Sequence, residues 1–202
     1  VIMEADTHNA YPDMQGTFGM PQLQKLKYLL DGSEYQKEAK ISITNAERNG
    51  ATIPVGIHFE NADGDFKNDY RFMNQEIINE KMKTVKFRGV NWDVEVVPTL
   101  AAVQRFSFQA GANAEHPTFL AKTEDGNLKF IFGDASTHGG EFVFATNVEG
   151  KLDRGWTWPV ASILSILKIA DVNNTKMNIS NEGAIQIELD SGLAKYKYII
   201  PA

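Results

Sequence analysis

The chain has 202 residues, of which 43% are hydrophobic and 23% are charged, a balance typical of a folded globular protein. It contains no apolar run of membrane-spanning length and no secretory leader pattern, so we expect a cytoplasmic protein, in the host cytoplasm if a phage encodes it. The absence of cysteine excludes disulfides, thiolate metal sites and thiol nucleophiles, and the net charge of -6 restricts any contact with nucleic acid to a local surface.

The first predicted helix begins at a proline. Phe18-Gly19-Met20-Pro21 is followed by leucines at helical spacing, and proline suits a first helical turn because its missing N–H costs nothing there. Three strands are predicted downstream from alternating apolar and polar residues: 40–44, 53–57 and 70–73. The mixed-polarity segment 74–91 then predicts a surface connector between two domains.

A second unit begins after the connector. We predict a strand over Asn91–Val97 and a helix from Pro98 to about Ala110. Three further strands are predicted, at Phe119–Lys122, Leu128–Phe132 and Glu141–Ala145.

The C-terminal part repeats the pattern of the first. Trp156-Thr157-Trp158-Pro159 matches residues 18–21, and apolar residues again follow at helical spacing. The strand Lys176–Ser180 matches 40–44, and two more strands follow at 184–189 and 196–199. The order helix, strand, strand, strand therefore occurs twice, which indicates an internal duplication.

The repeat predicts the domain division: a partial domain over residues 1–73, a connector over 74–91 and a full domain over 92–202. The first copy has 20 residues before Pro21, whereas the second unit has 67 before Pro159. We therefore expect a first domain that lacks its N-terminal half. The fold class predicted is α+β, with antiparallel strands and two helices in each full domain.

The duplicated unit resembles the DNA sliding clamps, which are the processivity factors of replicative polymerases. This family includes proliferating cell nuclear antigen and the clamps of the T-even phages. The residues that carry this resemblance are the Pro-helix segments, the closing strand Leu193–Ala202 and, more weakly, Asp6-Thr7-His8. It implies a non-enzymatic protein without cofactors, whose helices line a ring around duplex DNA and whose sheets form the outer wall. Two units in each chain fit the phage type, a homotrimer that works with a DNA polymerase and a clamp loader.

The resemblance also implies which residues meet DNA. Helix residues would offer positive or amide groups to phosphates without reading bases. The candidates are Lys25, Lys27, Gln104, Arg105, Gln109 and Lys168. The alternative for each is an ordinary solvated helix residue.

Clamps bind partner peptides in a hydrophobic pocket between the connector and the C-terminal tail. The candidates here are Ile77, Ile78 and Met82 on one side and Tyr198, Ile200 and Pro201 on the other. The alternative, most relevant to Tyr198, is a strand packed into its own core.

Two other functions stay open. A metal-dependent hydrolase would use Asp134, His138 and Glu141, although a turn between strands needs the same residue types. A β-rich viral structural or carbohydrate-binding module would stack Trp156 and Trp158 on sugars. The loop 61–69 has alternating oxygen ligands but lacks the rest of a calcium-loop pattern, and no nucleotide-binding or serine-elbow motif occurs.

Overall fold

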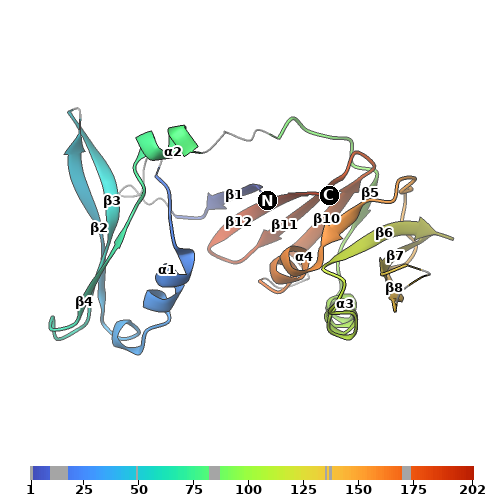
Figure 1. The fold of residues 1–202 in the computed structure, drawn as a ribbon, viewed down its shortest axis with the longest axis horizontal. Helices are drawn as coiled ribbons and strands as arrows, with labels where there is room; N and C mark the ends of the chain where they lie inside the picture. Colours follow the sequence, from blue (N-terminus) through green and yellow to red (C-terminus); the bar gives the residue numbers. More distant parts are fainter. Residues whose placement is uncertain are drawn as a thin grey trace. The chain divides into compact units, whose positions relative to one another are not determined.

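The computed structural model describes residues 2–9, 18–48, 50–81, 87–134, 136, 138–169 and 174–202. The chain folds as two compact units, each described by itself below: unit 1 comprises Val1–Asn9 with Phe87–Ala202, and unit 2 comprises Ala10–Lys86 (Figure 1). The sequence-based boundaries at 73 and 91 stay a prediction. Within the described ranges, none of the helices has both the length and the apolar character needed to cross a membrane.

Unit 1 contains the same set of elements twice. The first half runs β5 (Val94–Val96), α3 (Leu100–Ala112), β6 (Thr118–Glu124), β7 (Asn127–Phe132) and β8 (Gly140–Ala145). The second half runs β9 (Thr157–Pro159), α4 (Val160–Leu167), β10 (Thr175–Ser180), β11 (Ala184–Asp190) and β12 (Ala194–Pro201). Each half is a short strand, a helix and three strands; the sequence predicted this order except for the short strand β9.

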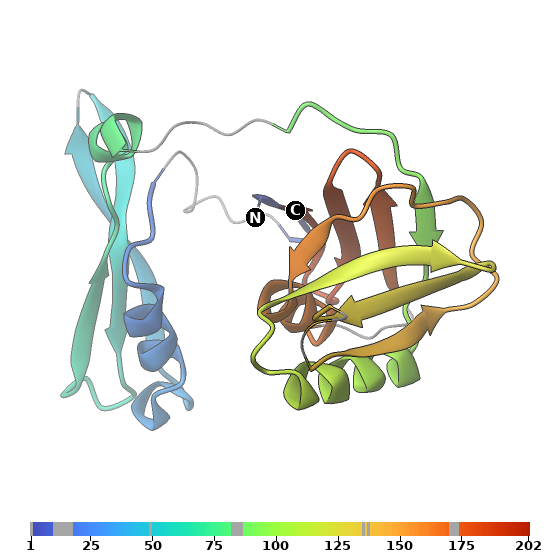
Figure 2. The same ribbon diagram turned by 45° about the vertical axis from the view of Figure 1, so that its right-hand side comes forward.

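The two halves of unit 1 exchange their short strands. The strand β5 of the first half pairs with β10, and β9 of the second half pairs with β6. The results are a five-stranded sheet, β1-β12-β11-β10-β5, and a four-stranded sheet, β8-β7-β6-β9, both antiparallel throughout. Figure 2 shows the four-stranded sheet in front of the five-stranded one. Neither sheet is complete without a strand from the opposite half.

The first strand of the chain, β1 (Ile2–Thr7), extends the five-stranded sheet. It pairs antiparallel with β12, from Ile2 opposite Ile199 to Thr7 opposite Ala194. Its side chains are exposed except for Ile2, which is half-buried. Backbone pairing therefore holds β1 to the sheet with little apolar burial.

The helix α3 supplies the centre of the unit 1 core. The side chain of Thr99 accepts a hydrogen bond from the backbone N–H of Ala102 at 3.1 Å and caps the helix. Phe106 is fully buried, and its ring centroid lies 5.0 Å from that of Phe119 and 5.3 Å from that of Phe130. These edge-to-face contacts fix the helix against the four-stranded sheet.

Unit 2 contains one such half. Its elements are α1 (Leu23–Leu30), a 3-10 turn (Ser33–Tyr35), β2 (Lys40–Arg48), β3 (Ala51–Glu60), β4 (Lys67–Arg71) and α2 (Gln75–Lys81). The three strands form one sheet in the order β2-β3-β4, and Gly19 forms a single bridge to Met73. The core is small, with five buried apolar residues: Leu26, Leu29, Tyr35, Phe59 and Tyr70.

The two prolines occupy positions just outside their helices. Pro21 precedes Gln22, the residue that caps α1 in a left-handed conformation with φ of 52°. The Pro21 carbonyl accepts a hydrogen bond from the Tyr70 hydroxyl, which ties it to β4. Pro159 pairs with Thr118 as the last residue of β9 and caps α4. The prediction of proline within the first turn was therefore wrong, because each proline is held by a neighbouring strand.

Replacing Phe106 by Ala should destabilise unit 1 by about 3–5 kcal/mol, because a large buried ring is lost and the surrounding rings can refill the space only in part. Urea unfolding followed by tryptophan fluorescence reports on unit 1 alone, since Trp92, Trp156 and Trp158 all belong to it. The matched control is Phe108→Ala on the same helix, where the ring is 73% exposed and we expect a change within about 0.5 kcal/mol. Equal effects of the two changes would contradict this account of the core.

Candidate functional site

Three of the helices lack acidic residues altogether. No Asp or Glu occurs in α1, α3 or α4, although the whole chain has 26 acidic residues against 20 Lys and Arg. Lys25, Lys27 and Arg105 lie within these helices, and Lys168 caps the C-terminus of α4. A helix C-terminus favours a cation because of its partial negative charge. These helices therefore carry a few cations and no acidic residue, in a chain whose net charge is -6.

The exposed face of α3 borders a shallow hollow of about 400 Å³. Its walls are formed by Ala101, Gln104, Arg105, Phe108 and Gln109 of α3 with Glu141 and Phe142 of β8. The Arg105 guanidinium carbon lies 5.6 Å from the centre of the Phe142 ring, a cation–π distance. The three α3 residues predicted to face DNA therefore share one surface, although Gln109 also accepts a hydrogen bond from the Asn113 side chain at 2.9 Å.

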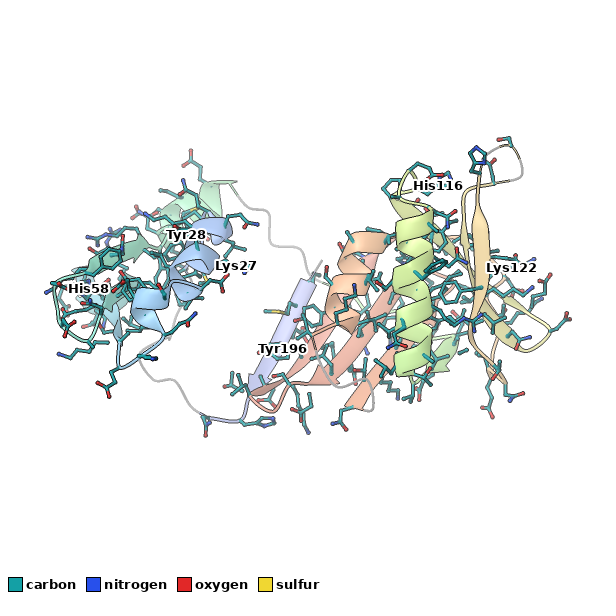
Figure 3. All side chains as sticks on the ribbon, turned by 90° about the horizontal axis from the view of Figure 1, so that it is seen from below. Lys27, Tyr28, His58, His116, Lys122 and Tyr196 are labelled. Carbon is teal, nitrogen blue, oxygen red and sulfur yellow. The ribbon has the colours of Figure 1, made fainter. Side chains whose placement is uncertain are left out.

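A polar contact joins the C-terminal end of the helix α4 to α3. The ammonium group of Lys168 donates to the hydroxyl oxygen of Ser107 on α3 at 3.1 Å. Figure 3 shows α3 and α4 side by side. Gln104, Arg105, Gln109 and Lys168 thus come from adjoining helices of unit 1. The structure adds Ser107 and Phe108, which the sequence reasoning did not single out because it considered only Lys, Arg and Gln.

The two remaining candidates project from α1 in unit 2. Lys25 and Lys27 are both exposed, and Lys27 forms an ion pair with Asp31 one turn away. Figure 3 shows Lys27 and its neighbour Tyr28 on this helix. The pairing with Asp31 weakens the field of Lys27, which leaves Lys25 as the stronger candidate on α1.

The predicted pocket residues fall in different units. Ile77 and Ile78 belong to α2 in unit 2, whereas Tyr198, Ile200 and Pro201 belong to β12 in unit 1; Met82 lies outside the described residues. Ile200 is 1% exposed and forms part of the unit 1 core, and Tyr198 packs against that core. Burial raises the pKa of the Tyr198 phenol. The pocket itself stays a prediction.

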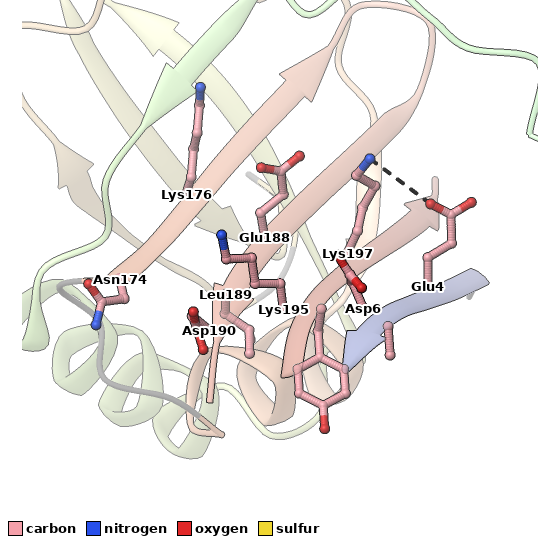
Figure 4. Close-up of a pocket in the computed structure, with 11 residues that line it drawn as sticks. Glu4, Asp6, Asn174, Lys176, Glu188, Leu189, Asp190, Lys195 and Lys197 are labelled. Carbon is pink, nitrogen blue, oxygen red and sulfur yellow. Dashed lines mark ion pairs between the residues drawn. The ribbon is translucent and has the colours of Figure 1, made fainter. Parts of the chain in front are cut away.

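A second surface, not expected from the sequence, lies on the five-stranded sheet. A groove of about 630 Å³ is lined from β1, β10, β11 and β12 (Figure 4). Charges alternate across the strands: Glu4 is paired in register with Lys197, Lys197 with Glu188, and Glu188 with Lys176. Lys176 in turn lies 2.6 Å from Glu95 of β5. Carboxylates and ammonium groups thus alternate on this face, whereas α1, α3 and α4 contain no acidic residue.

The alternative sites have structural roles. Asp134 accepts from the backbone N–H and the hydroxyl of Ser136, at 2.8 and 2.6 Å, and His116 contacts the His138 carbonyl oxygen at 2.6 Å. Among the described residues, no group of three or more His, Cys, Asp or Glu is placed to hold a metal ion. In the loop 61–69, the Asn61 side chain accepts from two backbone N–H groups, as in a tight turn.

The two tryptophans of the proposed sugar platform are used internally. Trp158 is fully buried in the core. The indole N–H of Trp156 donates to the Asn181 carbonyl at 2.8 Å, and its ring packs against Gly183, where φ is +85° and a side chain would meet the indole. Trp156 and Trp158 therefore do not form a paired, exposed aromatic surface for a sugar.

Comparison with solved structures shows which known proteins this fold resembles. The chain resembles the proliferating cell nuclear antigen (PCNA) of Thermococcus kodakaraensis, with a TM-score of 0.55 and 13% identity over 89% of this chain and 69% of that one. It resembles PCNA of A. fulgidus, solved with the C-terminal region of FEN-1, with a TM-score of 0.51 and 12% identity over 78% and 62%. A putative DNA polymerase III beta subunit of Eubacterium rectale matches with a TM-score of 0.51 and 14% identity, over 79% and 41%.

These matches show that the chain has the fold of the DNA sliding clamps, as the sequence resemblance predicted. The matched part spans 62% of the archaeal A. fulgidus chain and 41% of the bacterial one. No protein-family model matches the sequence, and no curated protein matches it.

The Asp190 carboxylate at the groove should titrate below its ordinary pKa of about 3.9. The backbone N–H of Gly192 and the His8 imidazole, 3.1 Å away, both favour the ionised form and lower the pKa. Because the folded-state pKa is depressed, the resulting stability is present above the unfolded pKa and is lost as the pH falls through the folded one.

Carboxyl NMR titration checks this prediction. In His8→Ala the pKa of Asp190 should rise while staying below its ordinary value, since the Gly192 N–H remains. Glu60 in unit 2 is the control and should not change. An Asp190 pKa that is the same with and without His8 would refute the assigned cause.

Proposed function

We propose that the chain is a subunit of a DNA sliding clamp, a non-enzymatic ring that encircles duplex DNA and tethers replication proteins to it. The observation that carries this proposal is the absence of acidic residues from α1, α3 and α4 in a chain of net charge -6. The clamp fold supports it. A protein that slides must hold phosphates without fixing its position, and a few cations and amides on helices do this without reading bases.

The charge distribution supports a mechanism in which DNA passes along the helices. Lys25, Arg105 and Lys168, with Gln104 and Gln109, would make weak and exchangeable phosphate contacts. Collective attraction matters more than any single pair, because exposed charges are screened over about 8 Å at physiological salt. The groove face, where charges alternate, and the acidic remainder would disfavour DNA on the outside.

Ring closure would proceed by pairing of sheet edges. Within unit 1, β1 already completes a sheet by adding to β12, so strand addition at an edge is a contact that this fold makes. The outer edge of β8 is unpaired within the described part of the chain. A head-to-tail contact of this edge with a neighbouring subunit would close a ring, for which the resemblance to the phage clamps favours three copies.

Partner proteins would bind at the pocket predicted between the connector and the C-terminal tail. We propose Ile77, Ile78 and Met82 with Tyr198 and Pro201 as its wall, and Ile200 as the buried residue beneath it. The A. fulgidus neighbour was solved with the C-terminal region of FEN-1, which supports peptide binding by this fold. A DNA polymerase and an ATP-driven clamp loader are the proposed partners here.

Threading onto DNA tests the proposal without a loader. The protein is incubated with linear duplex whose two biotinylated ends are then blocked with streptavidin, and retention is measured after a salt wash. A ring threads over free ends and is trapped by the blocks, so retention should require them. Equal retention with and without blocked ends, or none in either case, would contradict a ring.

Charge variants assign the DNA surface. A variant that combines Lys25→Gln, Arg105→Gln and Lys168→Gln should bind DNA with a weaker dependence on salt. The slope of log K against log salt concentration should become less steep by about 0.9 for each phosphate contact that is lost. The control combines Lys37→Gln, Lys122→Gln and Lys195→Gln, which removes the same charge from exposed positions outside the helices. Equal losses in the two variants would show that only net charge matters.

Distance measurement tests the pocket. Because the chain lacks cysteine, Ile77→Cys with Pro201→Cys gives two unique sites for spin labels. A shared pocket predicts a short, narrow distance distribution by electron spin resonance. The control pair, Ile77→Cys with Lys122→Cys, should give a longer one, and a broad long distribution for the first pair would refute the pocket.

A further inference from the structure

The outer face of α3 carries an aromatic ring that the core does not use. Phe108 is 73% exposed, whereas Phe106 two positions earlier is fully buried. The exposed ring belongs to a stripe at intervals of three or four residues, which places Ala101, Gln104, Arg105 and Phe108 on one face of the helix. This stripe borders the hollow of about 400 Å³ beside β8. A large ring left in water next to a hollow of this size indicates a binding surface.

The Arg105 guanidinium is held in place without an ion pair. It lies over the Phe142 ring, 5.6 Å from the ring centre, and that ring is 6% exposed and therefore fixed. Among the described residues, Arg105 has no carboxylate partner, since Glu141 of the same hollow lies 3.7 Å from Lys129 instead. The N–H groups of Arg105 are therefore left to donate to an anion, and a phosphate accepts such bonds well.

Glutamine amides lie beside the arginine. The side-chain oxygen of Gln109 accepts a hydrogen bond from the buried Asn113 side chain at 2.9 Å. Gly140 permits this arrangement, because a Cβ at that position would lie 2.5 Å from the same oxygen. The amide N–H groups of Gln109 and the whole amide of Gln104 have no partner in the described part of the chain. Such groups can bond to the edge of any base.

Together these groups suit an unpaired nucleotide. Proteins bind single strands by stacking bases on aromatic rings and by placing cations along the phosphates. A paired base within a duplex cannot use Phe108 in this way, because the neighbouring base pairs cover both of its faces. The helix α3 has no acidic residue, so it does not repel a phosphate chain.

We propose that the hollow lined by α3 and β8 binds single-stranded DNA, with one base stacked on Phe108 and the adjacent phosphate held by Arg105. The proposal rests on the proposed function in taking α3 to be a helix that faces DNA, and it adds a ligand that a ring around duplex does not require. Every base has a flat face that can stack, so the site should have little base preference. It would let the protein hold the unpaired strand beyond the end of a duplex.

Binding of a fluorescent oligothymidylate to the full chain, measured by anisotropy, tests the proposal. Phe108→Ala should weaken this binding about 5- to 150-fold, the range that corresponds to one stacked base, and should weaken binding to a blunt duplex less. Phe108→Trp should retain the affinity, whereas Phe108→Leu, which is apolar but cannot stack, should lose it.

The matched control is Leu100→Ala. Leu100 is 61% exposed on the same helix and does not line the hollow, so this change should leave the affinity for oligothymidylate unchanged. No binding by the wild-type chain, wild-type affinity in Phe108→Leu, or equal losses for single strand and duplex in Phe108→Ala would each overturn the proposal.

Photocrosslinking gives a second readout that a purely structural role of Phe108 would not produce. An oligonucleotide with 5-iodouracil in place of thymine should crosslink to the ring stacked on it, and mass spectrometry should place the crosslink at Phe108. Crosslinks at other positions only would overturn the proposal. Phe108-dependent binding of oligothymidylate without trapping on end-blocked duplex would refute only the ring. Trapping without Phe108-dependent binding would refute only this site, as expected if a protein segment occupies the hollow.

Discussion

The exchange of short strands between the two halves of unit 1 is the constraint on which the rest depends. Because β5 pairs with β10 and β9 pairs with β6, each sheet needs backbone partners from the other half. The exchange brings α3 and α4 together, so Lys168 can reach Ser107. Two helices far apart in the sequence are thus brought into contact, which no single half could provide.

The duplicated order of elements was predictable because apolar and polar residues alternate along most of the strands and apolar residues recur at regular spacing in the helices. Met177 and Ile179, with polar Lys176, Asn178 and Ser180 around them, carry that signal in the sequence, although the structure buries Asn178 and Ser180 as well. The exchange of β5 and β9 was not predictable, since three-residue strands have almost no periodicity and their partners are set by tertiary packing. That Pro98 precedes α3 as Pro21 and Pro159 precede α1 and α4 was missed because Glu95 stands three residues before Pro98, where the other two segments have the aromatic residues Phe18 and Trp156.

The candidate site was predictable only in part. Charged helix residues such as Arg105 can be listed from the sequence, but its stacking on Phe142 and the link between Lys168 and Ser107 depend on contacts across elements. Ile200 is a different case: the sequence suggested it as a pocket residue, and the structure buries its side chain in the core of unit 1. In the C-terminal strand the consecutive residues Ile199 and Ile200 are both buried and Pro201 is exposed, so its burial does not follow a simple alternation and depends on the packing of the core.

The pairing of β1 with β12 has a mechanical consequence. Ile2 lies opposite Ile199, so both ends of the chain leave the sheet at the same end of an antiparallel pair. A force that pulls the two chain ends apart loads the backbone hydrogen bonds between β1 and β12 one pair after another, beginning near Ile2 and Ile199. The two strands would then separate in the unzipping geometry and not in the shear geometry, in which all the bonds carry the load together. Because β1 buries little apolar surface, this strand resists a pull on the chain ends less than any strand within the sheet.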